Sequence, residues 1–314
     1  ADDQDKAISV VVKAQSSNTS FRGEATSAET QKVVVEPGSI ACTGHEGLMQ
    51  DVNASITLAV KSGSAVNWNV TITPGNPGLT INGNSRFAGN TANNSGGAVQ
   101  FESNNQYRTG ADGNLEYYRG ELNIIGTEDN PIVFRNNTAK NFSGGALCIG
   151  AHNTDKLDYL DVHDNTAQRY GGGIYINNSI TEGTLTNSKI CNNTTSWAGG
   201  GVDIHNYLDY QETKVNNATV ITRTGRPGDF TIRDCEITGN STTGTDGNCS
   251  GGGGIGITSD LRRSELYKVD SGTVNIIDTV VERNTTTLAG GGIYCGYNGT
   301  NNISGGSISN NTSG

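Results

Sequence analysis

Apolar residues recur along this chain in a fixed relation to asparagine and to paired glycines. In the clearest copy, Val281 stands three residues before Asn284, a threonine follows, and Gly290-Gly291 opens a short apolar segment. The asparagines of the copies, the last a half copy, are Asn90, Asn137, Asn165, Asn193, Asn240, Asn284 and Asn311. They are separated by 47, 28, 28, 47, 44 and 27 residues, so the basic unit has about 28 residues and longer units carry insertions. Such a period indicates stacked repeats.

Each unit also holds further apolar pairs. Leu122 and Ile124 precede one asparagine turn, and Val202 and Ile204 alternate after a glycine pair. Alternation with a period of two predicts strands, and three short strands in about 28 residues predict one coil of a solenoid. We therefore expect an all-β fold, a parallel β-helix with three strands per coil and a β-rich N-terminal cap. No coil could bury its apolar face alone.

The repeated residues suit the corners of such a coil. Asparagine tolerates the left-handed backbone conformation that a sharp corner needs, and its amide both donates and accepts hydrogen bonds. Asparagines stacked about 4.8 Å apart in successive coils can therefore form a ladder. A glycine pair supplies a positive φ and lets neighbouring coils approach without Cβ atoms.

Two stretches resemble a known family. They are Phe87-Ala88-Gly89-Asn90 with Gly96-Gly97-Ala98-Val99, and Phe134-Arg135-Asn136-Asn137 with Gly144-Gly145-Ala146-Leu147. They are similar to the two repeat signatures of the chlamydial polymorphic membrane proteins, a Phe-x-x-Asn turn and a Gly-Gly-Ala segment followed by an aliphatic residue. Later copies replace Phe by Val or Ile and Ala by Gly. The resemblance covers about residues 79–314 and implies a right-handed β-helix on a cell surface, usually adhesive. The family's C-terminal membrane barrel has no counterpart in this sequence.

Composition and charge argue against some classes of binding partner. Hydrophobic residues make up 33% of the chain, fewer than the roughly 45% of globular proteins, but they are periodic, so disorder is not indicated. The net charge of -10 and the absence of a Lys or Arg run argue against nucleic acid or an anionic membrane as partner. No apolar run reaches the length of a membrane span. A chain that starts Ala1-Asp2-Asp3 is typical of a mature secreted protein after signal cleavage.

Cysteines and glycosylation motifs fit an extracellular protein. Six cysteines allow up to three disulfides, and Cys235 and Cys249 flank the only enlarged asparagine turn, so we expect these two to pair. The alternative is that some, such as Cys295, are buried thiols. There are seventeen Asn-x-Ser/Thr motifs. Candidate glycosylation sites are Asn18, Asn53, Asn69, Asn136, Asn141, Asn177, Asn217 and Asn298. We expect no glycan on the ladder residues Asn193, Asn240 and Asn284.

The chain divides into an arm strand at residues 1–20, a β-rich cap at 21–78 and the β-helix at 79–314. Insertions at 102–121, 205–229 and 258–272 fall at one corner, after the glycine-pair strand. They hold six of the eleven tyrosines: Tyr107, Tyr117, Tyr118, Tyr207, Tyr210 and Tyr267. Insertions at one corner of successive coils lie side by side, so these tyrosines predict an aromatic binding face for glycans or proteins, or else loops that only cover the flank.

The two ends of the chain suggest assembly. The arm alternates at Ile8, Val10 and Val12 without a hairpin partner nearby, and the last unit, with Ile303 and Ile308, is an unfinished coil. An open strand edge invites pairing with another chain. An arm strand that fills the open coil of the next copy would build a head-to-tail filament.

Catalysis is a further possibility, because β-helices also host polysaccharide lyases and hydrolases. Hydrolases need paired carboxylates about 5–10 Å apart. The candidates are Asp161 with Asp164 around His163, and Asp203 near His205, but none recurs on a common strand of adjacent coils. We interpret them as solvated outward positions. The histidines show no metal-ligand spacing, so we expect neither a metal nor a cofactor.

These observations predict a secreted, non-catalytic structural or adhesive β-helix. We favour a head-to-tail filament subunit whose partners are copies of itself. The alternatives are a monomeric adhesin that binds glycans or proteins on the tyrosine face, and a polysaccharide lyase or hydrolase.

Overall fold

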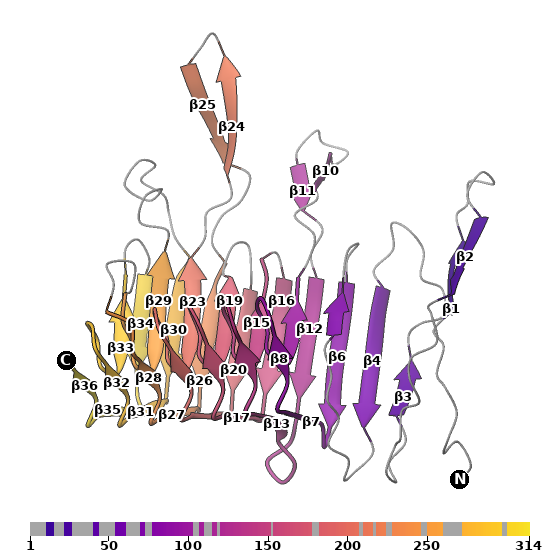
Figure 1. Ribbon diagram of the computed structural model, residues 1–314. Helices are drawn as coiled ribbons and strands as arrows, with labels where there is room; N and C mark the ends of the chain where they lie inside the picture. Colours follow the sequence, from indigo (N-terminus) through magenta and orange to yellow (C-terminus); the bar gives the residue numbers. More distant parts are fainter. Residues whose placement is uncertain are drawn as a thin grey trace.

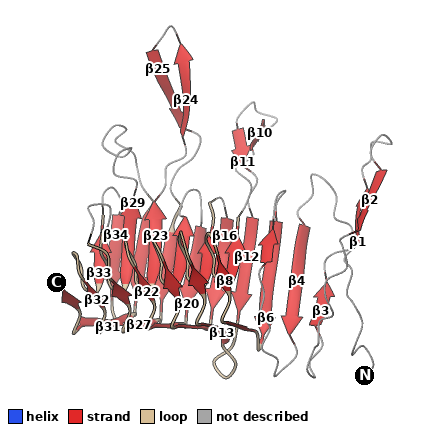
Figure 2. Cartoon of the chain, viewed as in Figure 1, coloured by secondary structure: helices blue, strands red, loops and turns tan. Residues whose placement is uncertain are grey.

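The structure is a computed structural model (Figure 1). It describes residues 77–102, 120–151, 153–177, 182–206, 228–245, 250–259, 272–296 and 300–314, and nine separate strands outside these ranges. Ile8, Val10, Tyr118, Tyr207, Tyr267 and Cys249 lie outside the described residues, as do Asn18, Asn53, Asn69, Asn217 and Asn298. All regular structure in the described part is β-strand (Figure 2).

Four sheets run along the molecule, and sheets 2, 3 and 4 are parallel throughout. Sheet 1 contains β3 (Ile40–Thr43), β4 (Ala54–Val60), β6 (Pro77–Gly83), β12 (Gly120–Ile125), β16 (Asn153–Asp158), β20 (Glu182–Thr186), β26 (Phe230–Arg233), β30 (Thr273–Ile277) and β34 (Thr300–Ser304). Sheet 2 contains β7 (Arg86–Ala88), β13 (Ile132–Arg135), β17 (Leu160–His163), β21 (Lys189–Cys191), β27 (Glu236–Thr238), β31 (Val280–Glu282) and β35 (Ser307–Ser309).

Sheet 3 contains β8 (Thr91–Ala92), β14 (Thr138–Ala139), β18 (Thr166–Ala167), β22 (Thr194–Thr195), β28 (Ser241–Thr242), β32 (Thr285–Thr286) and β36 (Thr312–Ser313). Sheet 4 contains β5 (Val70–Ile72), β9 (Val99–Phe101), β15 (Leu147–Ile149), β19 (Ile174–Asn177), β23 (Val202–Asn206), β29 (Ile255–Ser259) and β33 (Ile293–Cys295). Three antiparallel hairpins lie outside these sheets: β1 (Val11–Gln15) with β2 (Arg22–Thr26), β10 (Tyr107–Thr109) with β11 (Leu115–Tyr117), and β24 (Tyr210–Val215) with β25 (Ala218–Arg223).

The chain visits one strand of each sheet in turn, so the predicted parallel β-helix is confirmed, with one correction. A complete coil has four strands rather than three. The additional strand is the two-residue one of sheet 3 directly after the ladder asparagine, such as Thr138–Ala139. Two residues are too few for an alternating pattern to be visible in the sequence.

Side chains of equivalent strands stack inside the coils. Ile124, Leu157 and Leu185 are paired in register across β12, β16 and β20, and all three are fully buried. The rings of Phe87 and Phe134 stack with centroids 4.7 Å apart. Since burial of one such side chain contributes about 1.5–3 kcal/mol, the stability of each coil depends on its neighbours.

The left-handed residue of the asparagine corner is displaced from its predicted position. Positive φ angles fall on the residue before each ladder asparagine: Gly89, Asn136, Asp164, Asn192, Gly239, Arg283 and Asn310. The reversal at this residue turns the chain so that the next side chain points inward. The ladder asparagine itself is needed for its amide, not for its backbone conformation.

The two glycines of each pair have separate roles. The first carries the positive φ, as Gly144 does at 69°. The second lies against the next coil, where a Cβ on Gly145 would come within 2.0 Å of the Gly172 carbonyl oxygen. The first glycine therefore supplies the predicted positive φ, and the second allows the predicted close approach of neighbouring coils.

The N-terminal region departs from the prediction in two places. Strand β4 pairs in parallel with β6, and β5 with β9, so coil-forming strands begin before residue 79, inside the predicted cap. Strand β3 then pairs antiparallel with β4 at the end of sheet 1. The arm strand β1 does have a hairpin partner, because Val12 pairs with Ala25 of β2. The alternation around Val12 was visible in sequence, but the polar strand Arg22–Thr26 was not.

Candidate functional site

The seven repeated asparagines form one continuous ladder. Oδ1 of Asn165 accepts hydrogen bonds from the backbone N–H and from Nδ2 of Asn137, both at 2.9 Å. Nδ2 of Asn165 also donates to the Phe134 carbonyl in the preceding coil at 3.0 Å. The same bonds link every step from Asn90 to Asn311. Asn137 through Asn284 are fully buried, so the ladder is a structural site. Their amides are bonded on both sides, which is why we keep the prediction that they carry no glycan.

The insertions leave the coil at a single corner. The chain segments between β9 and β12, between β23 and β26, and between β29 and β30 all connect a strand of sheet 4 to a strand of sheet 1. Hairpins β10–β11 and β24–β25 project from the same edge of the solenoid in Figure 1. Tyr107 and Tyr117 are direct partners across the first hairpin, and Tyr210 begins β24. Three of the six predicted tyrosines are thus on projecting hairpins.

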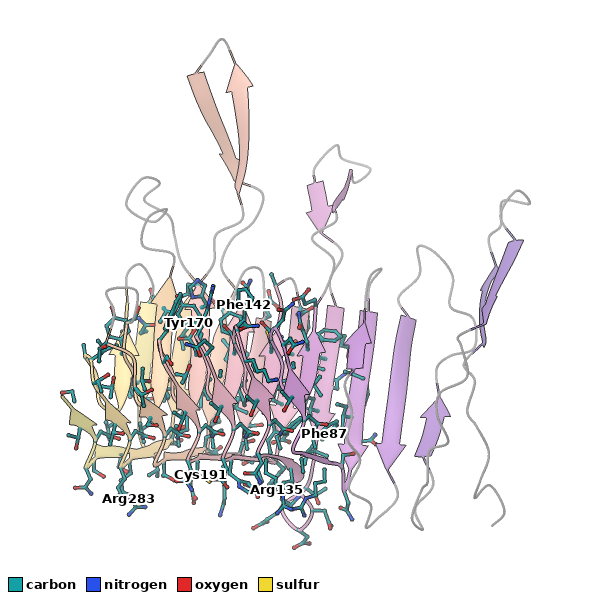
Figure 3. The ribbon with its side chains drawn as sticks, in the orientation of Figure 1. Phe87, Arg135, Phe142, Tyr170, Cys191 and Arg283 are labelled. Atoms are coloured by element: carbon teal, nitrogen blue, oxygen red, sulfur yellow. The ribbon has the colours of Figure 1, made fainter. Side chains whose placement is uncertain are left out.

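An aromatic cluster that the sequence did not predict lies near this edge. The Arg169 guanidinium lies over the Phe142 ring at 4.2 Å and over the Trp197 ring at 4.8 Å. Tyr170 meets Trp197 edge-on, with ring centroids 5.3 Å apart. Figure 3 shows Phe142 and Tyr170 toward the edge that bears the hairpins, and Arg135, Cys191 and Arg283 toward the opposite edge. Phe142, Arg169 and Trp197 come from the sheet 3 to sheet 4 turns of successive coils, which only the coil register aligns.

A polar cluster lies beside these rings on the outer face of sheet 4. Thr258 Oγ1 donates to Asp203 at 3.0 Å and lies 2.8 Å from Nδ1 of His205. The Tyr170 and His205 rings are 5.2 Å apart. Asp203 is fully buried, and burial raises the pKa of its carboxyl well above the usual range, although the Thr258 hydrogen bond lowers it. Asp203 and His205, which are near each other in sequence, both contact Thr258. Asp203 is buried, so the expectation of a solvated outward residue is wrong for it.

The second acidic candidate is an open surface feature. Nδ1 of His163 lies 2.7 Å from Asp164 Oδ2, and Asp161 Oδ2 lies 4.0 Å from Nε2. Cys191 pairs with His163 in the adjacent strand. Burial, followed by the charges of Asp161, Asp164 and Glu236, raises the pKa of the Cys191 thiol, although Lys189 lowers it. Cysteine chemistry requires the thiolate, so these surroundings do not activate Cys191 as a nucleophile.

The predicted Cys235–Cys249 disulfide is absent. Cys148, Cys191, Cys235 and Cys295 are free thiols. Cys235 lies in the core, and its Sγ donates to the Arg233 carbonyl at 3.2 Å, so its sulfur is turned inward. The position of Cys235 in sequence beside the enlarged turn gave no indication of this inward direction.

The other candidates occupy varied surroundings. Asn136 and Asn141 are exposed, and Asn141 Nδ2 donates to the Asn93 carbonyl at 2.6 Å. Asn177 is half-buried. Across the described ranges, no three His, Cys, Asp or Glu side chains gather closely enough to hold a metal ion. The part of the chain that the structure describes contains no helix able to cross a membrane.

Fold and site together define the class of this protein as a parallel β-helix with a projecting, aromatic edge. Comparisons with protein-family models, with curated proteins and with solved structures find no match to this chain.

Proposed function

We propose that this chain is a non-catalytic extracellular β-helix, an adhesive protein that binds glycans or proteins along its projecting edge. The observation that carries the proposal is the gathering of hairpins β10–β11 and β24–β25 and of the Phe142–Arg169–Trp197 stack toward one edge. Trp, Tyr and Arg are the residues most enriched at the energetic centres of interfaces. Phe142 is 39% exposed and is available to a partner.

The polysaccharide-cleaving alternative has less support. Asp203 and Thr258 are 0% and 2% exposed, so a substrate has no access to their polar atoms. The side chains of Asp161 and Asp164 lie beside His163 and are 34% and 47% exposed, so neither carboxylate is held in a desolvated site. An assay for new reducing ends on acidic and neutral polysaccharides tests this alternative directly.

Loop exchange tests the adhesive proposal. Replacing residues 103–119 and 207–227 by short glycine turns removes both hairpins and leaves the sheets intact. The control shortens the turn at residues 126–131, which joins sheet 1 to sheet 2 at a different corner. We expect the control to keep binding on glycan arrays and on host-cell surface proteins, and the hairpin variant to lose it. Equal binding by both variants would refute a binding edge.

A second candidate is the filament. Ile303 and Ile308, in the last coil, are 48% and 51% exposed, and one more coil would cover them. The arm strand β1 is a weaker donor than expected because it pairs with β2. If copies stack through this coil, Ile303→Thr with Ile308→Thr lowers the mass measured by light scattering, whereas the exposed control Phe142→Thr does not. Removal of residues 1–20 then shows whether the arm takes part.

A further inference from the structure

One inward column of the coils changes its chemistry in two successive repeats. In register along sheet 1 this column reads Leu79, Leu122, Asp155, Gly183, Phe230 and Val274. Asp155 is 2% exposed and points into the core, as does Asn153, two residues earlier on the same strand and 0% exposed. An aspartate replaces leucine here at the centre of an apolar stack.

The two side chains are not satisfied by the protein. Both carboxylate oxygens of Asp155 and Oδ1 of Asn153 are buried without a hydrogen-bond partner. Only Nδ2 of Asn153 is bonded, to the Gly150 carbonyl at 2.7 Å. Three acceptor oxygens therefore share one interior face without a donor, whereas buried polar groups are almost always paired.

Glycines accompany this pair in the adjacent coils. A Cβ on Gly120 would lie 2.4 Å from Oδ1 of Asn153, so this glycine leaves room for the amide. A Cβ on Gly183 would meet the Phe230 ring at 2.5 Å before it met Cβ of Asp155 at 3.2 Å, so this glycine makes room first for the ring. The glycine of the preceding coil therefore accommodates the polar pair.

We propose that Asp155 and Asn153 bind a hard metal cation inside the β-helix. Carboxylate and amide oxygens are the ligands that such cations prefer. Three acceptor oxygens without a donor fit a bound cation better than they fit another polar side chain. Buried charge must be paired. One carboxylate balances one monovalent ion, so Na⁺ matches the charge, while Ca²⁺ matches the ligand type. The site is independent of the proposed adhesive edge.

Thermal unfolding of the full chain tests the site. At pH 8 and constant ionic strength, replacing choline chloride by NaCl, or adding CaCl₂, should raise the Tm of the unmodified protein by several degrees. Asp155→Asn keeps the shape and removes the charge, so its Tm should not respond. Asp161→Asn, on the outer surface of the next strand β17, is the matched control and should respond as the unmodified chain does. The response should weaken toward low pH, because protons compete for Asp155.

Calorimetric titration of the unmodified protein with NaCl and with CaCl₂ keeps the test decisive even if Asp155→Asn fails to fold. Saturable binding of either ion supports the site and identifies its class. Binding of neither ion would overturn the proposal and make Asp155 an uncharged buried acid.

Discussion

At the scale of single residues, two adjacent residues of each asparagine corner have different roles, one in the backbone turn and one in the hydrogen bonds of the ladder. The residue before the ladder asparagine takes the left-handed conformation, and six of the seven coils place Gly, Asn or Asp there. Arg283, with φ 54°, is the exception. Its side chain is 68% exposed, and its ion pair with Glu282, 3.4 Å away, contributes little.

Arg283→Gly should therefore stabilise the protein. The left-handed conformation costs a residue with a Cβ about 1–2 kcal/mol, so we expect a gain of about 1 kcal/mol in the free energy of unfolding by urea. The control Lys189→Gly, in the regular strand β21, should lower stability by about 0.5–1 kcal/mol. Destabilisation by both changes would show that the Arg283 backbone is not under strain.

Asn193→Ala should have the opposite, larger effect. It removes the acceptor of the Asn165 backbone N–H and Nδ2, and the donor to the Val162 carbonyl. Each buried group left unpaired costs about 1–3 kcal/mol, so we expect a loss of at least about 3 kcal/mol in chemical unfolding. Asn123→Ala, whose amide bonds the exposed Glu121 carboxylate at 2.9 Å, should change stability by less than about 1 kcal/mol. Comparable losses would mean that the ladder is not a special source of stability.

Thiol reactivity distinguishes the cysteines. Burial raises the pKa of Cys148 and of Cys235 to about 12, so almost no thiolate exists at pH 8. We expect iodoacetamide to leave both unmodified in the native protein and to modify them in urea without reductant, as read by mass spectrometry. The more accessible Cys191 and Cys295 should react first. If Cys235 stayed unmodified in urea until a reductant was added, the disulfide prediction would be restored.

At the scale of the element, contact between coils depends on the second glycine of each pair. Gly145→Ala would place a methyl group 2.0 Å from the Gly172 carbonyl oxygen and 2.7 Å from the Thr166 backbone. Because these neighbours are main-chain atoms, the coils must separate, and we expect a loss of about 3 kcal/mol or more. Ala146→Gly, one residue later and fully buried, should cost about 1 kcal/mol. The losses of stability in the two variants are measured by thermal unfolding followed by circular dichroism.

Some elements could be predicted from sequence and others could not. The long strands were visible because inward residues such as Ile124 and Ile204 alternate with polar ones. Thr138–Ala139 and Arg22–Thr26 were missed because one is too short to alternate and the other is polar. The Phe142–Arg169–Trp197 stack needs the coil register, and the inward direction of Asp155 becomes visible only when its strand is aligned with those of Leu122 and Phe230.

At the scale of the whole molecule, the coils are equivalent units joined by nearest-neighbour contacts. Deleting residues 138–165 joins Asn137 directly to Thr166 and removes one turn in register. We expect this variant to fold with an unchanged β-sheet spectrum. Its urea m-value should be smaller, because the surface exposed on unfolding is a sum over the repeats of a solenoid. A deletion of 138–163, two residues shorter, breaks the register and should not fold. If both variants fold equally well, the coils are not interchangeable units.

The asparagine ladder also gives the rod an electrical direction. The side-chain carbonyls of Asn137 through Asn311 all accept from the preceding coil, so their oxygens point toward the N-terminal end. Aligned amide dipoles add, as they do in an α-helix. The first coils therefore carry the partial negative charge of this column and the last coils the positive, and an approaching ion can distinguish the two ends of the molecule.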